Sequence, residues 1–349
     1  MSENKRKEYP DNWAELRLLA QDKIKQKIPA RVDNWTHVTG GAETGATWKR
    51  NFQALDEVGF HMKTIHSIDT ANVKTNINLL GKNLNHPVAI APMASAVNDV
   101  SENGFVEMGE GAKIAGAAAS IGYPNSTESV QKMVSTGAPV FQIIKPLKEI
   151  DKLIKLLRQA EDMNCFAVGV DTDSIAGLKP EGDKILFNNI CRTLTLKELK
   201  TVRESVNVPF IIKGVMSVED AQACLEIGAD AIIVSNHAGF SLDYSLSSIE
   251  ALPEIVDTVG EKMQIIFDSG IRRGSDILKA FALGADAVMI GRLALWGLAI
   301  GERDGLAWVL QLLEEELKRS MVLTGVQNLN EVNKSILLPL GDIGRNLLK

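Results

Sequence analysis

PFIIKGVMSVEDAQACLEIGADAIIVSNHAGFSLD, residues 209–243, is the stretch that decides the fold. Two short apolar runs, Phe210–Ile212 and Ala231–Val234, flank a segment whose apolar residues recur at helical spacing. Continuous β-branched runs that are joined by a helix predict parallel strands buried on both faces. Lys213 and His237 follow these two runs, and the carboxyl ends of such strands are where α/β barrels build their active sites. An ammonium group and an imidazole that face one pocket predict a charge stabiliser and a general base.

The same alternation of apolar run, polar turn and amphipathic helix continues from residue 87 toward the C-terminus. Helical patterns such as 147–163, 196–205 and 274–283 separate the apolar runs. Eight strands that alternate with helices predict a (β/α)8 TIM barrel, and a doubly wound open sheet is the alternative. The predicted strands are Val88–Ala91, Ala117–Ala119, Val140–Ile144, Phe166–Val170, Phe210–Ile212, Ala231–Val234, Ile265–Phe267 and Ala287–Ile290.

The first 86 residues do not follow this alternation. Apolar residues at helical spacing predict a helix over Trp13–Ile28, which Pro29 ends. A second short helix is predicted within Trp48–Phe60. We interpret residues 1–86 as an N-terminal extension of helices and loops that caps the barrel, and residues 87–349 as the barrel itself.

The composition is that of an ordinary globular protein. A net charge of −6 with scattered basic residues predicts no nucleic-acid partner. The chain has no apolar run that could span a bilayer and no signal-peptide core, so we expect a cytoplasmic protein without a membrane partner. Its three cysteines lack metal-ligand spacing, which favours buried reduced thiols and no metal site. His61, His66 and His86 lie in irregular polar surroundings and are expected at the surface.

The loops after the last two predicted strands indicate a phosphate site. Gly270 and Arg272 follow one strand, and Gly291 and Arg292 follow the next. In many barrels these two loops hold a phosphate with glycine amides and a helix N-terminus. Glycine permits close backbone approach, and arginine can contact a phosphate through two parallel hydrogen bonds.

The sequence resembles the FMN-dependent 2-hydroxy-acid oxidases and dehydrogenases, such as glycolate oxidase and lactate oxidase. The resemblance runs from about Trp13 to the end of the chain. It implies a (β/α)8 barrel with FMN at the carboxyl ends of the strands. The motifs that carry it are PFIIKGV (209–215), VSNHAG (234–239), FDSGIRRGSDILKA (267–280) and IGR (290–292), with weaker support from IAPMA (90–94), FQI (141–143) and GVDTD (169–173).

The resemblance also implies a role for individual residues. His237 would be the base that takes the hydroxyl proton, Asp171 would orient it, and Lys213 would lie near flavin N1. The residues implied in FMN binding are Pro92, Met93, Ala94, Ser120, Gln142 and Ser235 around the flavin, with Asp268, Gly270, Arg272, Gly291 and Arg292 at the ribityl-phosphate tail.

The substrate side departs from the family pattern. Phe240 and Leu178 stand where the family has arginines that bind the substrate carboxylate. Ile144 and His37 stand where the family has tyrosines. Lys179 is the nearest candidate for a replacement cation. A buried carboxylate without a partner is costly, so the substrate needs another cation or carries no acid group.

Three functions follow from these observations. The first is an FMN-dependent oxidoreductase that acts on a 2-hydroxy acid, lactate- or glycolate-like or bulkier. The second is a flavin-dependent isomerase resembling type 2 isopentenyl-diphosphate isomerase, and the third is a non-catalytic FMN-binding homologue. The sequence leaves open whether oxygen or another acceptor reoxidises the flavin, and the resemblance suggests a homotetramer.

Overall fold

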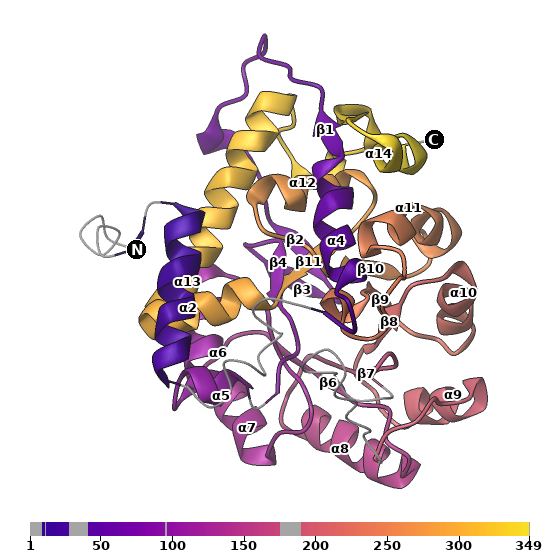
Figure 1. The fold of residues 1–349 in the computed structure, drawn as a ribbon. Helices are drawn as coiled ribbons and strands as arrows, with labels where there is room; N and C mark the ends of the chain where they lie inside the picture. Colours follow the sequence, from indigo (N-terminus) through magenta and orange to yellow (C-terminus); the bar gives the residue numbers. More distant parts are fainter. Residues whose placement is uncertain (1–8, 11, 28–40, 95, 175–189, 349) are drawn as a thin grey trace.

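The computed structural model describes residues 9–10, 12–27, 41–94, 96–174 and 190–348 (Figure 1). Its centre is a sheet of eight strands in the order β4-β11-β10-β9-β8-β7-β6-β5, and every pairing within it is parallel. An isolated parallel bridge between Ala89 and Ala118 links β4 to the β5 side and closes the ring. The predicted (β/α)8 barrel is therefore confirmed, and the open-sheet alternative is wrong. The strands are β4 (Val88–Ile90), β5 (Ala119–Ile121), β6 (Val140–Ile144), β7 (Ala167–Asp171), β8 (Phe210–Val215), β9 (Ala231–Val234), β10 (Gln264–Phe267) and β11 (Ala287–Ile290).

At least one helix follows every strand of the barrel and covers its outside (Figure 1). The helices bury apolar residues against the barrel, and several of them follow a polar capping residue. Thr195 and Glu198, for example, form a capping box at the start of α9. The last helix has a break in its backbone at Gly301 and Glu302. The helices are α5 (Ala96–Val100), α6 (Gly104–Ala115), α7 (Thr127–Ser135), α8 (Ile150–Asp162), α9 (Leu196–Glu204), α10 (Val218–Glu226), α11 (Ser248–Val259), α12 (Gly274–Ala282) and α13 (Arg292–Thr324).

The segment before the barrel contacts both barrel ends. Its elements are α2 (Trp13–Lys27), α4 (Ala46–Asp56), β1 (Val58–Phe60), η2 (Thr70–Asn72), β2 (Ile77–Leu79) and β3 (Lys82–Leu84). The β2–β3 hairpin lies at the amino-terminal end, where Gln264, the first residue of β10, exchanges hydrogen bonds with the backbone of Asn78 and Leu80. Helix α4 lies at the carboxyl end, where the side-chain amides of Asn51 and Asn236 bond each other at 3.0 and 2.8 Å.

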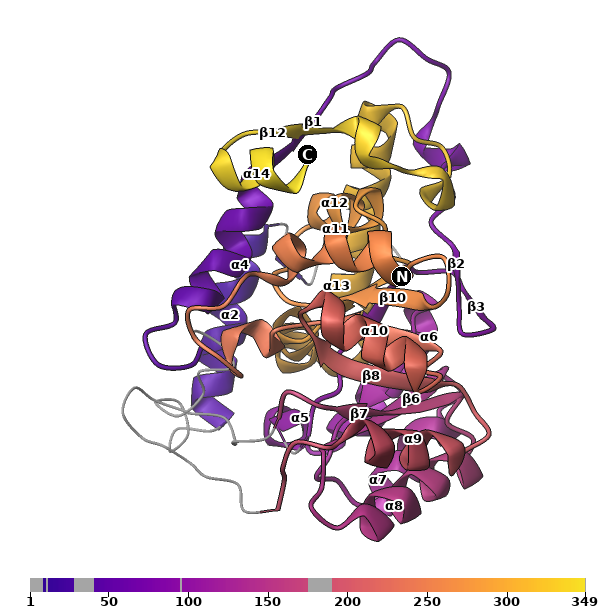
Figure 2. The same ribbon diagram turned by 90° about the vertical axis from the view of Figure 1, so that its right-hand side faces the viewer.

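The two ends of the chain meet in a small separate sheet. Strand β1 pairs antiparallel with β12 (Leu337–Pro339), and the two strands lie side by side in Figure 2. Two short helical turns, η4 (Leu329–Glu331) and η5 (Lys334–Ile336), precede β12, and α14 (Asp342–Leu347) follows it. This pairing fixes α4, which runs directly into β1, against the C-terminal part of the chain.

The surroundings of the histidines and cysteines differ from expectation at one position. His61 and His66 are exposed, and the three cysteines are buried and form no disulfide with one another, as predicted. The prediction that His86 lies at the surface is wrong. Its imidazole is buried, with Nε2 2.8 Å from the Leu310 carbonyl oxygen of α13 and Nδ1 accepting from Val88 N. No helix of the part of the chain that the structure describes is long and apolar enough to cross a bilayer.

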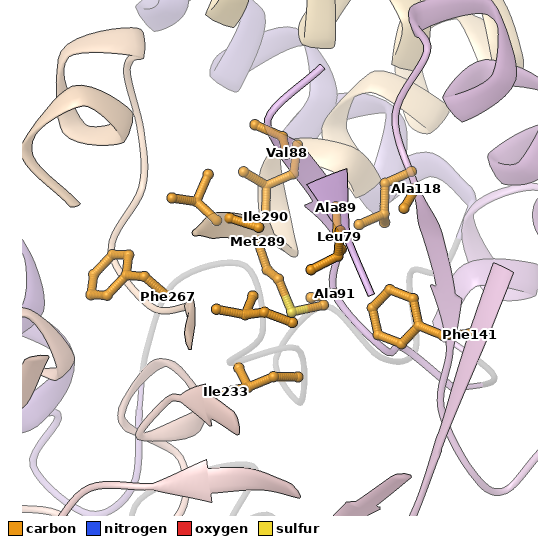
Figure 3. Close-up of a cluster of buried hydrophobic side chains, with 14 of the residues drawn as sticks. Leu79, Val88, Ala89, Ala91, Ala118, Phe141, Ile233, Phe267, Met289 and Ile290 are labelled. Carbon is orange, nitrogen blue, oxygen red and sulfur yellow. The ribbon is translucent and has the colours of Figure 1, made fainter. Parts of the chain in front are cut away.

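The hairpin β2–β3 supplies a test of the fold. Leu79 is fully buried in the apolar cluster that includes Phe141 and Met289 of the barrel (Figure 3). We expect Leu79→Ala to lower the free energy of unfolding by about 2–5 kcal/mol, because the truncation leaves a cavity in this cluster. Urea unfolding at saturating cofactor measures the change. The matched control Leu18→Ala, at a side chain that is 62% exposed, should change it by less than about 0.5 kcal/mol. An equal loss in both variants would show that the hairpin does not close the core.

Candidate active site

His237 lies in a tightly turned segment directly after β9. His237, Ala238 and Gly239 of η3 all have positive φ, at 56°, 55° and 80°. The turn is held by side chains, since Ser235 Oγ accepts from His237 N and Ser269 Oγ accepts from Ala238 N. Non-glycine residues in this backbone region persist only where the surroundings enforce them, and such residues concentrate at functional sites.

One nitrogen of the His237 ring points into a cluster of charged groups. Nδ1 lies 3.1 Å from Asp173 Oδ1, 3.3 Å from Lys213 Nζ and 3.7 Å from Asp171 Oδ2. Asp171, the predicted partner of this ring, lies within ion-pair distance of it, and Asp173 lies closer. Asp173 was missed although it ends the GVDTD motif, two residues beyond β7. With Nδ1 committed to the cluster, Nε2 is the ring nitrogen available to a substrate.

Asp171 is instead bound by two lysines. Lys213 Nζ donates to its Oδ1 at 2.9 Å, and Lys145 Nζ donates to its Oδ2 at 3.2 Å. Burial acts to raise the pKa of Asp171, but the two ammonium groups outweigh it and hold the pKa well below its usual range. Lys145 follows β6 directly and was also missed, although a lysine at a strand end is the same signal that identified Lys213.

Lys213 lies inside β8 rather than after it, because the strand continues to Val215. Its side chain is only 3% exposed. Burial acts to lower the pKa of Lys213, but the carboxylates of Asp171 and Asp173 reverse this and raise it. Lys213 therefore carries a fixed positive charge in the barrel mouth at neutral pH.

Among the residues that the structure describes, one group of side chains could hold a metal ion. It consists of Asp171, Asp173 and His237, whose ligand atoms lie within 4.8 Å of one another. The Lys213 ammonium group contacts both Asp171 and the His237 ring. The positive charge that a metal ion would supply is thus already provided by a lysine.

The residues predicted to line the flavin lie at the neighbouring strand ends. Pro92, Met93 and Ala94 are half-buried directly after β4, and Gln142 is buried in β6. Ser120 lies within β5, not after it as predicted, and its hydroxyl donates to Ile90 O at 2.6 Å. The Ser235 hydroxyl donates to Asp268 Oδ2 at 2.9 Å.

The two loops that are predicted to hold the phosphate, after β10 and β11, are called the phosphate loops. They contain buried hydrogen-bond donors without a partner among the described residues, which fits the binding of an anionic group. Arg292 stands at the start of α13, and its guanidinium makes no hydrogen bond to any residue that the structure describes. Burial lowers the pKa of Arg292 to about 10, so the group still carries its charge at neutral pH. Arg272 pairs with Asp56 at 2.6 Å, yet its Nε is buried without a partner among the described residues, as is Trp48 Nε1. Buried donors without partners are rare in proteins and indicate a missing acceptor.

Aromatic residues of α4 and one glycine shape the same loops. The Arg272 and Arg292 guanidinium groups lie 4.7 and 5.6 Å from the Phe52 ring, and Arg292 lies 5.7 Å from the Trp48 ring. Gly270 has φ 105°, and a Cβ there would lie 3.0 Å from Asn51 O. The residues present therefore fit the phosphate of FMN, with α4 as an unpredicted third component.

The two predicted substrate-pocket residues that the structure describes are apolar and buried. Ile144 is buried in β6, and Phe240, which follows η3, is 4% exposed. The other predicted substrate-pocket residues, His37, Leu178 and Lys179, lie outside the described residues.

The chain is similar over nearly its whole length to known enzymes. The family described as FMN-dependent dehydrogenase matches residues 24–188 and 177–339. A 2-hydroxyacid oxidase from Dictyostelium discoideum is 31% identical over 96% of this chain and 92% of that protein. A 4-hydroxymandelate oxidase from Amycolatopsis orientalis is 30% identical over 92% of this chain and 96% of that protein. The crystal structure of an arginine-to-leucine variant of mandelate oxidase with 2-hydroxy-phenylacetamide has a TM-score of 0.81 and 29% identity, over 92% of this chain and 96% of that chain.

Arg292 tests the phosphate site. We expect Arg292→Ala to weaken FMN binding by about 10- to 100-fold, since hydrogen bonds to charged groups contribute about 1.5–3 kcal/mol. Titration of the apoprotein with FMN, followed by flavin fluorescence, measures the dissociation constant. Arg303→Ala is the control, because Arg303 pairs with Glu110 on the surface of α13 and α6. Unchanged FMN affinity in Arg292→Ala would remove this arginine from the cofactor site.

Proposed function

The chain belongs to the FMN-dependent dehydrogenase family, and we propose that it oxidises the hydroxyl-bearing carbon of a 2-hydroxy acid, or of an uncharged analogue, to the 2-oxo product. FMN is its cofactor, and it is an oxidoreductase acting on a CH–OH group. One observation carries the proposal: the imidazole, two carboxylates and a buried ammonium group share a barrel end with the unpaired arginine of the phosphate loops.

We assign His237 the role of base. Its Nδ1 is held by the charged cluster, so Nε2 is the atom that accepts the hydroxyl proton of the substrate. The chemistry that bound FMN supplies is acceptance of the two electrons that leave the carbon. The Lys213 ammonium group provides a fixed positive charge in the same pocket, and the carboxylates balance the charge that His237 gains.

We further propose that the preferred substrate is bulkier or less charged than glycolate and lactate. Phe240 and Ile144 stand where the resemblance implies an arginine and a tyrosine, and both are buried and apolar. Support comes from the relative whose arginine-to-leucine variant was crystallised with 2-hydroxy-phenylacetamide, an uncharged amide. A carboxylate placed against Phe240 would lose its hydration without gaining a cation.

Anaerobic mixing of the FMN-loaded protein with a substrate panel tests this function. The panel holds small 2-hydroxy acids, aromatic 2-hydroxy acids, their amides and plain secondary alcohols, and the measurement is bleaching of the flavin absorbance. Bleaching by 2-hydroxy compounds supports the oxidoreductase, and the order of rates identifies the substrate class. An FMN-loaded protein that no member of the panel reduces would contradict the function and favour a non-catalytic homologue or an isomerase. The homotetramer and the cytoplasmic location stay predictions.

The role of His237 has its own test. We expect His237→Ala to retain FMN and to slow flavin reduction by about 10²–10⁴-fold, because a positioned general base contributes roughly that factor. Stopped-flow absorbance under anaerobic conditions measures the rate. The control is His61→Ala, at an exposed histidine of the same chain. In this variant the substrate should reduce the flavin at the parental rate. A parental rate in His237→Ala would show that another group takes the proton.

Phe240 tests the assignment of the substrate class. We expect Phe240→Arg to raise kcat/KM for lactate about tenfold or more, since a guanidinium can bind a carboxylate through two parallel hydrogen bonds. Leu242→Arg, which adds the same charge two residues further on at a 65% exposed side chain, is the control. If the natural protein already oxidises lactate faster than the aromatic amides, an unidentified cation holds the carboxylate and the proposal fails.

A further inference from the structure

We propose that Asp173, and not Asp171, is the carboxylate that positions His237 for catalysis. This inference rests on the proposed function, in which His237 is the base. The shortest contact of His237 Nδ1 to a carboxylate is the 3.1 Å contact to Asp173 Oδ1, whereas Asp171 Oδ2 lies 3.7 Å away. A distance of 3.1 Å is a hydrogen bond, and 3.7 Å is outside that range. The geometry therefore separates two carboxylates that the sequence alone could not rank.

Asp171 is already committed to other donors. Its Oδ1 accepts from Lys213, and its Oδ2 accepts from both Lys145 and the Ser174 hydroxyl. Two ammonium groups thus share one carboxylate. A proton donor on His237 would have to compete with Lys145 and the Ser174 hydroxyl for a lone pair of Oδ2. Asp171 is better described as the anchor that holds Lys213 and Lys145 in the barrel mouth.

Asp173 is held in place from the other side. Its Oδ2 accepts from the Ser241 hydroxyl at 2.8 Å, while its Oδ1 faces the imidazole. The backbone makes room for it at Gly214 of β8, which has φ 95°, since a Cβ there would lie 2.7 Å from Asp173 Cβ. Ser241 follows η3, so the loop after β9 carries both the base and the residue that fixes its partner. This arrangement orients the ring so that Nε2 faces away from the cluster.

The charges around the ring support the same assignment. The charged groups that face His237 are Asp171 of β7, Asp173 of the loop that follows it and Lys213 of β8, and Lys145 lies behind Asp171. With a neutral ring, the two carboxylates balance the two ammonium groups. When the ring takes the substrate proton, Asp173 is the nearest carboxylate, and Asp171 is already neutralised by its lysines.

A double-mutant cycle between Asp173 and Ser241 tests the positioning role. We expect Asp173→Asn to slow flavin reduction by about 10²–10³-fold with FMN affinity unchanged, and to move the acidic limb of the pH profile of kcat/KM to lower pH. Ser241→Ala should slow the parent by about threefold to tenfold, because it frees the carboxylate to rotate, and should add nothing in the Asp173→Asn background. Independent, multiplying effects of the two substitutions would overturn the proposal.

A second measurement needs no substrate. Side-chain nitrogen NMR of the resting FMN-loaded protein reports which ring nitrogen of His237 carries the proton, and His237→Ala assigns the signal. We expect the proton on Nδ1 in the parent and in Asp171→Asn, and a shift toward the Nε2-protonated form in Asp173→Leu. Loss of the Nδ1 proton in Asp171→Asn with its retention in Asp173→Leu would assign the role to Asp171.

The kinetic and the NMR measurements distinguish a failure of the proposed function from a failure of the positioning role. If no 2-hydroxy compound reduces the flavin, the proposed function fails, and the NMR comparison still decides which carboxylate holds the ring. If flavin reduction proceeds but both Asp173 variants keep the parental rate, pH profile and protonation pattern, the positioning role is wrong and the proposed function stands.

Discussion

The ion pair between Lys213 and Asp171 is the contact on which the site depends. It joins the neighbouring strands β7 and β8, where the two residues are also partners in the strand register, and both side chains are almost fully buried. Removing one partner of a buried pair leaves an unpaired charge and costs about 3–5 kcal/mol. Because the folded-state pKa of Asp171 is lowered, the stabilisation is present above the ordinary pKa of an aspartate and is lost only as the pH falls through the lowered value. Lys145 donates to the same carboxylate, and the His237 ring lies 3.3 Å from the Lys213 ammonium group.

Most of the barrel could be predicted from the sequence because the strands consist mainly of apolar, often β-branched residues. The strand ends could not, since apolarity does not mark where backbone pairing stops. Two errors show this. Lys213 was expected after β8 but lies within it, and the Ala117–Ala119 run was expected to be β5, which instead spans Ala119–Ile121. The open-sheet alternative was excluded by contacts such as the Ala89–Ala118 and Met93–Ile121 bridges, which join segments that sequence periodicity cannot relate.

The site was predictable where a polar residue interrupts an apolar run, as at Lys213, His237 and Arg292. It was not predictable where function depends on three-dimensional proximity. Asp173 and Ser241 are far apart in sequence, yet one fixes the other, and the distances that rank Asp173 above Asp171 exist only in the fold. Arg272 was assigned to the phosphate from its loop, but its pairing with Asp56, 216 positions earlier, could not be read from that loop.

The contribution of α4 to the phosphate loops has a consequence for the order of events during synthesis. Trp48 and Phe52 leave the ribosome early, whereas Arg292 and the strand β12 that anchors β1 are made near the end. N-terminal segments emerge first at about 5–20 residues per second, so α4 waits for its partners while most of the chain is translated. Such long-range closure is slow because the loop entropy is lost before the contacts form. Cofactor capture is therefore a late event of the finished polypeptide, and a nascent chain that stops before α13 cannot hold the coenzyme.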